Sequence, residues 1–318
     1  MLTRTAPWAI AILTLCVGLL VPWLKTPLVT AISYGFAALG VSFLVRAGQV
    51  SFGHAGFTCL SGYAVVAISR TWPQVDGLLL LVVSALTGGV AGAVIGLFMV
   101  RYRGIFFGML NLALSMVLFA ALGKFYNVSG GTDGLRLERP SFLGQTLDRA
   151  SFETWLLVLC AILLVVATRL AARFYASPTG QALFALKTNE VRLEYLGISA
   201  KAIFYRAYVA SAVLCGFAGG MFALIQGLVS PEMGYWVRSG EYVFIAVLGG
   251  TLHPVGAFIG SIAFEFLKLF AASALTGAWQ MVIGTVLLVL IFVAPSGLVV
   301  WLLRFDRQRK HPAAAKAS

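Results

Sequence analysis

Residues 77–100 read GLLLLVVSALTGGVAGAVIGLFMV, and no charged side chain interrupts these 24 positions. A helix that crosses a bilayer needs about 20 consecutive apolar residues. Inside a bilayer every backbone N–H and C=O group must be bonded within the protein, and a helix does so within one segment. The stretch therefore predicts a membrane-spanning α-helix.

Similar apolar runs recur along the whole chain. Of its 318 residues, 60% are hydrophobic and only 11% are charged, whereas soluble domains are about 25% charged. The strand alternation of an outer-membrane barrel is absent from the sequence. We therefore predict an all-α, polytopic helical membrane protein with about ten apolar spans, at residues 7–24, 27–45, 50–69, 77–100, 104–122, 152–168, 205–228, 240–252, 255–275 and 279–302.

One of these runs is too short to cross a bilayer by itself. Residues 240–252 are separated from the next run by His253-Pro254, and proline both lacks an N–H donor and restricts the residue before it. We expect a short or re-entrant pair near 240–275.

Glycines recur at four-residue spacing within several runs, a pattern that lets helix backbones approach closely in lipid. We interpret them as packing sites rather than binding sites. They are Gly88, Gly92 and Gly96, and the pairs Gly104/Gly108, Gly216/Gly220 and Gly256/Gly260.

The distribution of basic residues predicts the orientation, because Lys and Arg are retained on the cytoplasmic side. With the N-terminus inside and ten crossings, fifteen of the 23 Lys and Arg residues face the cytoplasm and seven face outward. Met1–Trp23 resembles a signal peptide but lacks a small-residue cleavage site, so we expect a retained first span. This gives an N-in, C-in transmembrane domain over 1–302, an outer loop near 123–151, an inner loop near 173–202 and a basic, disordered cytoplasmic tail at 303–318.

Several classes of chemistry find no support in the sequence. No GxxxxGK[ST] or GxGxxG motif is present, so nucleotide binding by this chain is not expected. No HExxH, GxSxG or Cys/His cluster occurs, so we predict no catalytic residue, metal or cofactor of its own. The net charge of +12 resides in short loops and the C-terminus, which argues against a nucleic-acid partner. Transport or channel function is the remaining class.

A charged segment stands out between the apolar runs. Residues 177–199 read SPTGQALFALKTNEVRLEYLGIS. Ser177 followed by Pro178 is typical of a helix start, and Gly197 suits a helix end. We predict one amphipathic cytoplasmic helix of about five turns. It would lie on lipid headgroups, act as a gating linker or dock on a soluble partner.

Polar residues within apolar runs are candidates for a substrate path. The stretch GQVSFGHAG (48–56) combines three glycines with Gln49, Ser51 and His54. Irregular backbone at membrane depth is tolerated only where it is buried in protein or lines a cavity. A packing kink, in which these side chains bond backbone groups, is the alternative.

Charges within the membrane are costly and are therefore functional candidates. Glu241 is one, although at a helix start it would also complement the helix dipole. Glu265 lies three residues before Lys268, so we expect these two to form a structural pair.

Five segments, in order and at compatible spacing, resemble those of the permeases of branched-chain amino-acid ABC transporters, in particular the LivM-type subunit. They are GQVSFGHAGFTCLSGYAVVAI (48–68), GGTDGL (130–135) with Arg-Pro at 139–140, SPTGQALFALKTNEVRLEYLGIS (177–199), GMFALIQGLVSP (220–231) and EYVFIAVLGGTLHPVGAFIGS (241–261).

This resemblance implies an importer subunit in a bacterial inner membrane, surrounded by membrane lipid. Its partners would be a homologous LivH-type permease subunit, two cytoplasmic ATPase subunits that bind ATP, and a periplasmic substrate-binding protein. Residues 177–199 would form the coupling region on the ATPase, with Pro178, Gly180, Lys187, Glu190, Glu194 and Gly197 as its candidate residues. Val191-Arg192-Leu193 stand where the family often has small residues, which leaves the docking register open.

The outer loop would contact the binding protein through Thr132 and Asp133, with a tight turn as the alternative. The resemblance leaves the substrate open among branched-chain amino acids, other amino acids, amides and urea. Two rival classes are a secondary transporter or channel, which requires acidic sites at mid-membrane, and a membrane enzyme or lipid-handling protein, which requires a catalytic cluster.

Overall fold

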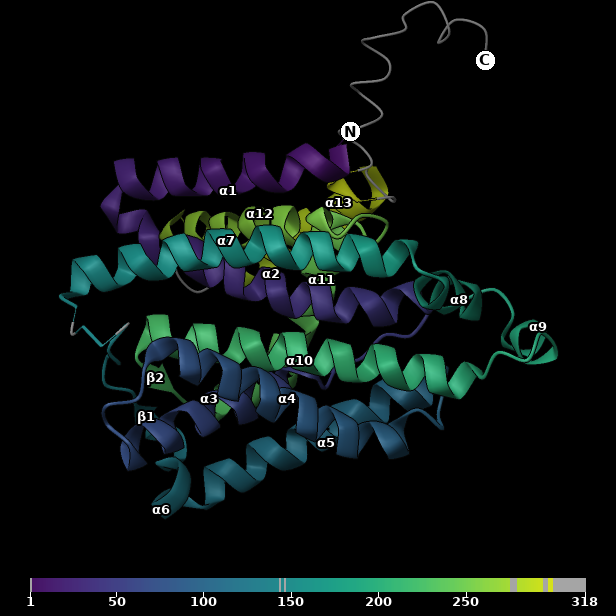
Figure 1. Cartoon of the computed structure of the whole chain (residues 1–318), viewed down its shortest axis with the longest axis horizontal. Helices are drawn as coiled ribbons and strands as arrows, with labels where there is room; N and C mark the ends of the chain where they lie inside the picture. Colours follow the sequence, from purple (N-terminus) through teal and green to yellow (C-terminus); the bar gives the residue numbers. More distant parts are fainter. Residues whose placement is uncertain (1, 143, 146, 275–278, 294–296, 300–318) are drawn as a thin grey trace, which may run out of the picture.

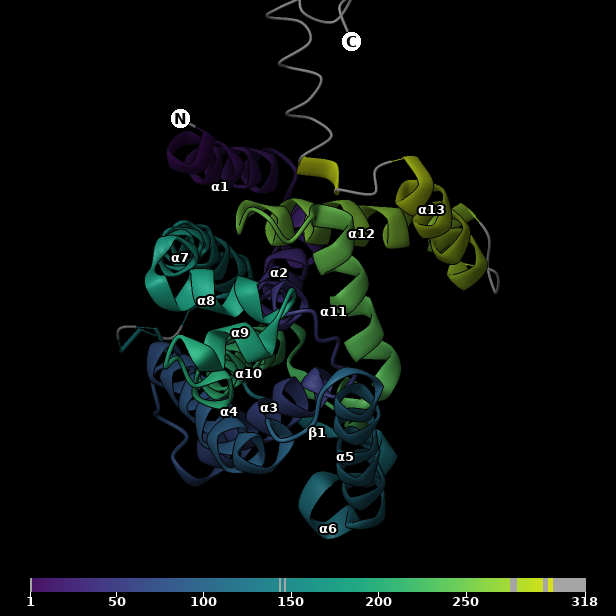
Figure 2. The ribbon, with the colours of Figure 1, turned by 90° about the vertical axis from the view of Figure 1, so that its right-hand side faces the viewer.

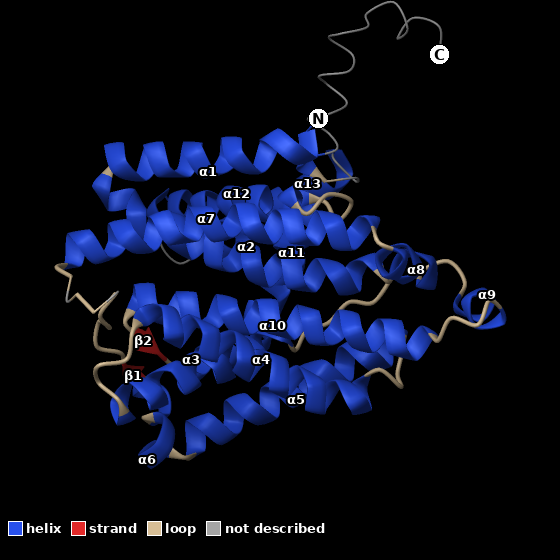
Figure 3. Cartoon of the chain, viewed as in Figure 1, coloured by secondary structure: helices blue, strands red, loops and turns tan. Residues whose placement is uncertain are grey.

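The computed structural model describes residues 2–142, 144–145, 147–274, 279–293 and 297–299, so the predicted tail at 303–318 lies outside the described residues. The described part is mostly helical (Figure 3). Its α-helices are α1 (Leu2–Leu20), α2 (Lys25–Arg46), α3 (His54–Thr71), α4 (Gly77–Met99), α5 (Gly104–Lys124), α6 (Tyr126–Ser129), α7 (Arg149–Ala176), α8 (Pro178–Leu186), α9 (Glu190–Tyr195), α10 (Ala200–Gln226), α11 (Trp236–Gly249), α12 (Val255–Ala274) and α13 (Trp279–Val293). Two short strands, β1 (Leu135–Arg136) and β2 (Leu228–Val229), and three 3-10 turns, η1 (Pro22–Leu24), η2 (Gly131–Asp133) and η3 (Pro231–Gly234), complete it.

Each of the ten predicted apolar runs overlaps one of these helices. Six described helices are long and apolar enough to cross a membrane: α2 with η1, α4, α5, α7, α10 and α12. The predicted class, a polytopic helical membrane protein, is confirmed. The number of crossings and their direction stay predictions.

The long helices lie along a common axis (Figure 1). Helices α8 and α9 lie at one end of this bundle, and β1, β2 and α6 lie at the other. We call these the α8–α9 end and the β1–β2 end. Helix α2 is the central element, since 94% of its apolar window is buried, against 28% for α4 and 22% for α5.

Close helix packing rests on several of the glycines that the sequence predicted for it, but not on Gly104, where an added Cβ would meet nothing within 4 Å. Gly88 of α4 faces α10, where a Cβ on Gly88 would come within 2.7 Å of the Gly216 Cα. A Cβ on Gly260 of α12 would lie 2.5 Å from the Ile245 carbonyl oxygen of α11. Backbones this close exclude any larger residue, so the packing interpretation is confirmed at these positions.

Two helices begin inside the bundle rather than at its ends. Residues 47–53 lead from α2 to α3 without forming a helix. The second such helix is α11, which follows β2 and η3. The carbonyl of Gly234, at the end of η3, accepts a hydrogen bond of 2.7 Å from Ser115, midway along α5. Helix α11 then runs between α5 and α12 (Figure 2). Its 14 residues span ~21 Å, less than the ~30 Å of a bilayer core. The short element expected near 240–275 is therefore present.

The prediction of one five-turn helix over 177–199 is wrong, because the segment forms two short helices. Helix α8 ends at Leu186 and α9 begins at Glu190. The Asn189 side chain accepts a hydrogen bond of 3.0 Å from the Arg192 backbone N–H and so starts a new helix. An asparagine side chain that bonds nearby backbone competes with helix continuation.

The predicted ends of this segment are confirmed. Ser177 Oγ accepts a hydrogen bond of 3.2 Å from the Gly180 backbone N–H, with Pro178 as the first helical residue. Gly197 adopts φ +74, the left-handed conformation that glycine accepts without a Cβ penalty.

Candidate functional site

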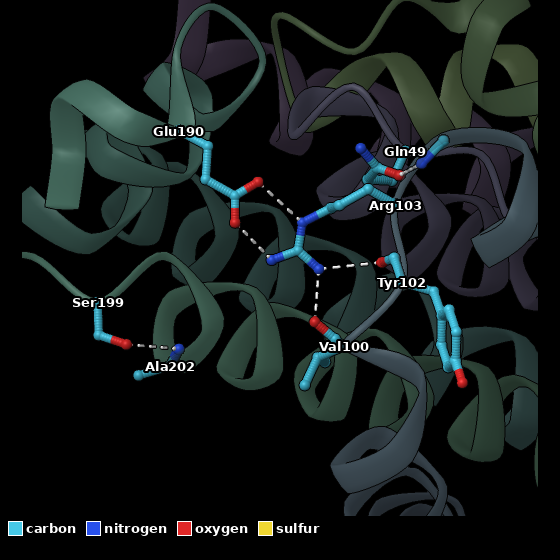
Figure 4. Close-up of polar contacts among 8 residues, drawn as sticks. Gln49, Val100, Tyr102, Arg103, Glu190, Ser199 and Ala202 are labelled. Atoms are coloured by element: carbon cyan, nitrogen blue, oxygen red, sulfur yellow. Dashed lines mark hydrogen bonds and ion pairs between the residues drawn. The ribbon is translucent and has the colours of Figure 1, made fainter.

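The candidate site lies at the α8–α9 end, where three segments distant in sequence meet. Glu190 of α9 accepts two hydrogen bonds from Arg103, at 3.1 Å from Nε and 3.0 Å from Nη2 (Figure 4). The remaining guanidinium nitrogen, Nη1, donates to the carbonyls of Val100 at 2.6 Å and Tyr102 at 3.0 Å. Such a bidentate geometry fixes both partners, because the guanidinium fork matches the carboxylate.

The loop before α3 joins the same cluster. Gln49 Oε1 accepts a hydrogen bond of 2.6 Å from the backbone N–H of Gly104, the residue after Arg103 (Figure 4). The Arg103 guanidinium carbon also lies 4.5 Å from the ring centre of Phe204 in α10. Two adjacent residues, Arg103 and Gly104, therefore connect the 47–53 loop, the turn between α4 and α5, α9 and α10.

The predicted coupling residues fall into two groups, those that contact the rest of the protein and those that are exposed. Glu190 points into the protein and is occupied by Arg103, whereas Lys187, Glu194 and Gly197 are exposed. Gly180 is buried against the carbonyl of Phe174, where no Cβ would fit. Glu190 therefore makes an internal contact, whereas its exposed neighbours form a surface that is free to bind a partner.

The free surface of α9 and of the residue after it contains three large apolar side chains beside the charged Arg192 and Glu194. Val191 is 58% exposed, Tyr195 87% and Leu196 70%. The sequence did not indicate these residues as candidates for a partner contact. It indicated Arg103 only as one of the basic residues that predict the orientation in the membrane. The signal that could have found them is the presence of large apolar side chains in a segment that its charges place in water.

Ser51 and His54 lie in a packed interior. His54 is 0% exposed, its Nδ1 lies 2.7 Å from Ser51 Oγ, and its ring packs against Phe57 and Tyr208. The Ala55 backbone N–H donates a hydrogen bond of 2.9 Å to Ser239 of α11. These contacts favour the alternative of a packing kink for this part of the stretch.

Glu241 is buried in a charged cluster. Its Oε2 lies 3.1 Å from Arg238 Nη1 and its Oε1 lies 3.6 Å from Lys268 Nζ. Glu241 is the sixth residue of α11, so it does not serve the helix start. Lys268 pairs with Glu241 and also interacts electrostatically with Glu265, so the expected Glu265–Lys268 interaction belongs to a larger cluster.

Thr132 and Asp133 are exposed in η2 at the β1–β2 end. The flanking Gly130 and Gly134 have φ +71 and +72, and the Asp133 backbone N–H donates to the Gly130 carbonyl at 3.2 Å. The predicted tight turn is present, and β1 pairs antiparallel with β2 beside it. The contact with a binding protein stays a prediction.

Within the described ranges, no group of three or more His, Cys, Asp or Glu residues is placed to hold a metal ion. The fold defines a polytopic helical membrane protein. The chain belongs to the family described as the permease component of branched-chain amino acid transport systems, whose model matches residues 24–292.

Individual relatives agree with that family. The chain is 28% identical over 239 residues to the high-affinity branched-chain amino acid transport system permease protein LivM of Escherichia coli and to that of Salmonella typhimurium. Each match covers 68% of this chain and 56% of the relative, so the chain spans little more than half the length of these proteins.

A third relative is covered more completely. The chain is 22% identical to the probable branched-chain amino acid transport permease protein LivH of Methanocaldococcus jannaschii, over 81% of this chain and 84% of that protein. No solved structure matches the chain.

Proposed function

We propose that this chain is one of two membrane subunits of an ATP-driven importer for branched-chain or related amino acids in a bacterial inner membrane. The family match and the names of its relatives support this proposal. The second membrane subunit is a homologue of LivH type. A periplasmic binding protein delivers substrate, and two ATPase subunits supply the energy.

The α8–α9 end faces the cytoplasm and docks on an ATPase subunit. The observation that carries this assignment is the exposed apolar surface of Val191, Tyr195 and Leu196 on a short helix outside the bundle. Large apolar side chains clustered in water are typical of a protein–protein contact. The β1–β2 end then faces the periplasm, with Thr132 and Asp133 toward the binding protein. Ten crossings with both termini inside agree with this orientation.

The coupling path runs from α9 through the Arg103–Glu190 ion pair. When the ATPase moves α9, the pair carries the turn between α4 and α5 with it. Gln49, bonded to Gly104, transfers that movement to the loop before α3. A loop that enters the bundle ahead of a helix that begins inside it is an element able to switch a path between two states.

The docking assignment is tested by co-purification of the complete transporter. Tyr195→Ala combined with Leu196→Ala is expected to lower the amount of ATPase recovered with the membrane subunits at least fivefold. The matched control is Tyr126→Ala, since Tyr126 is 62% exposed at the opposite end. Equal recovery of the ATPase with the double variant and with the control would overturn the docking surface.

A further inference from the structure

A cluster of four charged side chains joins α11 and α12 and contacts Tyr34 of α2, away from the α8–α9 end. Glu241 pairs with both Arg238 and Lys268. Arg238 Nη1 also donates a hydrogen bond to the hydroxyl of Tyr34. Glu265, three residues before Lys268, interacts electrostatically with Arg238, Glu241 and Lys268. The cluster therefore contains two cations and two carboxyl groups within one small volume.

The cluster lies well inside the length of the bundle. Tyr34 is nine residues into α2 and Lys268 is thirteen residues into α12, which places them ~14 Å and ~20 Å along helices of ~33 Å and ~30 Å. Charges at such depth face protein or water, not lipid. Yet the side chains of Arg238 and Lys268 are 30% and 22% exposed. The open side of the cluster therefore faces water or another protein subunit rather than lipid.

Arg238 keeps one edge of its guanidinium available. The contacts found among the described residues use only Nη1, which donates to Tyr34 and to Glu241. The Nε–Nη2 edge has no partner there. Arg103 uses this same edge to bind the carboxylate of Glu190. The Nε–Nη2 edge of Arg238 has the geometry with which a guanidinium binds a carboxylate through two hydrogen bonds.

Glu265 shows the complementary feature. Its Oε2 is buried and has no hydrogen-bond partner within the described part of the chain. A buried acceptor without a donor is costly, and an ammonium group supplies three donors with the opposite charge. One molecule that carries both a carboxylate and an ammonium group would satisfy Arg238 and Glu265 together.

We propose that this cluster is a subsite for a zwitterionic α-amino acid in transit. The Nε–Nη2 edge of Arg238 binds the α-carboxylate, and Glu265 accepts hydrogen bonds from the α-ammonium group. Both oxygens of Glu241 are occupied, so Glu241 positions Arg238 and Lys268. The apolar side chain of the amino acid lies against Val237 and Phe244, each 45% exposed on α11. This inference rests on the proposed function of amino-acid import.

The first test measures uptake of radiolabelled L-leucine by the complete transporter in proteoliposomes. Arg238→Lys keeps the charge but removes the fork, and Glu265→Gln removes the negative charge. Each is expected to lower uptake at least tenfold. The matched controls are Arg149→Lys and Glu153→Gln, which alter an ion pair on α7 that is 72% exposed at Arg149 and are expected to leave uptake unchanged.

The second test asks whether the cluster faces water, which a purely structural ion network does not require. Val237→Cys is made with Cys16→Ser, because Cys16 is the one exposed cysteine among the described residues. A cationic methanethiosulfonate reagent is expected to label Cys at 237 and to label it at least threefold more slowly with leucine, loaded binding protein and ATP present. Val94→Cys, on the exposed apolar face of α4, is the control and is expected to stay unlabelled.

The outcomes separate the two proposals. Leucine uptake unchanged in both charge variants, or no labelling at 237, overturns the subsite and leaves the proposed function intact. Labelling at 237 that leucine does not slow overturns it as well. If Arg238→Lys fails to assemble, the labelling of Val237→Cys decides. A wild-type transporter that takes up no amino acid overturns the proposed function itself.

Discussion

Arg103 and Glu190 form a bidentate ion pair although 87 residues separate them in the sequence. The pair attaches α9 to the turn between α4 and α5, and the carbonyls of Val100 and Tyr102 hold the same guanidinium. Helix α9 is therefore anchored to the bundle by this ion pair, together with the buried side chain of Leu193. The proposed route of energy into the membrane domain depends on this contact.

Arg103→Lys is expected to uncouple ATP hydrolysis from transport. Lysine keeps the positive charge but has no planar fork, so it cannot hold the carboxylate and both carbonyls at once. We expect substrate-stimulated ATP hydrolysis by the complete transporter to fall about fivefold. The pair is 25% and 34% exposed, and ion pairs near the surface contribute only about 0–1 kcal/mol to stability. The melting temperature should therefore change little.

Arg149→Lys is the control for that variant, because Arg149 also pairs with a glutamate, Glu153, at 3.0 Å. The control should hydrolyse ATP at the wild-type rate. Full stimulation by substrate in Arg103→Lys would show that the ion pair does not transmit the movement of α9.

Gln49→Leu is expected to lower uptake by removing the acceptor for the Gly104 backbone N–H. Loss of one hydrogen bond costs about 1 kcal/mol. If the bond stabilises the transition state of the conformational change, the uptake rate should fall about fivefold. Gln49→Glu retains an acceptor oxygen and should transport better than Gln49→Leu. The measurement is the initial rate of leucine uptake, and an equal rate for both variants would contradict the assigned role.

Gly216→Ala is expected to destabilise the packing of α4 against α10. The added Cβ would lie 2.6 Å from the Ser84 carbonyl oxygen and 2.7 Å from the Gly88 Cα, both backbone atoms that cannot rotate away. Overpacking of this kind costs about 1–3 kcal/mol. Thermal unfolding in detergent should show a melting temperature lower by several degrees.

The matched control for the glycine is Gly123→Ala in α5, where a Cβ meets nothing within 4 Å. Its melting temperature should equal or slightly exceed that of the wild type, since alanine favours a helix more than glycine does. A control that melts as early as Gly216→Ala would mean that the effect does not come from the helix contact.

Much of the fold could be predicted from local patterns. Apolar length located the helices, Ser177-Pro178 and Gly197 located the ends of the α8–α9 segment, and Gly88 indicated close packing. These features depend on residues near one another in sequence or on a regular spacing. The break at Asn189 was missed because a polar residue is compatible both with a helix surface and with a cap.

The contacts of the candidate site could not be predicted in this way. Arg103 of the α4–α5 turn pairs with Glu190 of α9, and Glu241 of α11 pairs with Lys268 of α12. A single sequence does not show how helices align with one another, so it indicated Glu265 as a partner of Lys268 but not Glu241. Partner choice among charges is a tertiary property.

Ser239→Ala is expected to loosen the start of α3, because Ser239 of α11 caps it from another helix. The Ala55 backbone N–H donates to Ser239 Oγ at 2.9 Å, and Ser239 is 0% exposed. Loss of a cap costs about 1 kcal/mol, so backbone amides near Ala55 should exchange with deuterium about fivefold faster. Mass spectrometry of peptides covering residues 47–60 measures this. Ser273→Ala is the control, since Ser273 is exposed and bonds only the Phe270 carbonyl of its own helix. If exchange near Ala55 is the same in both variants, α11 does not hold the start of α3 in place.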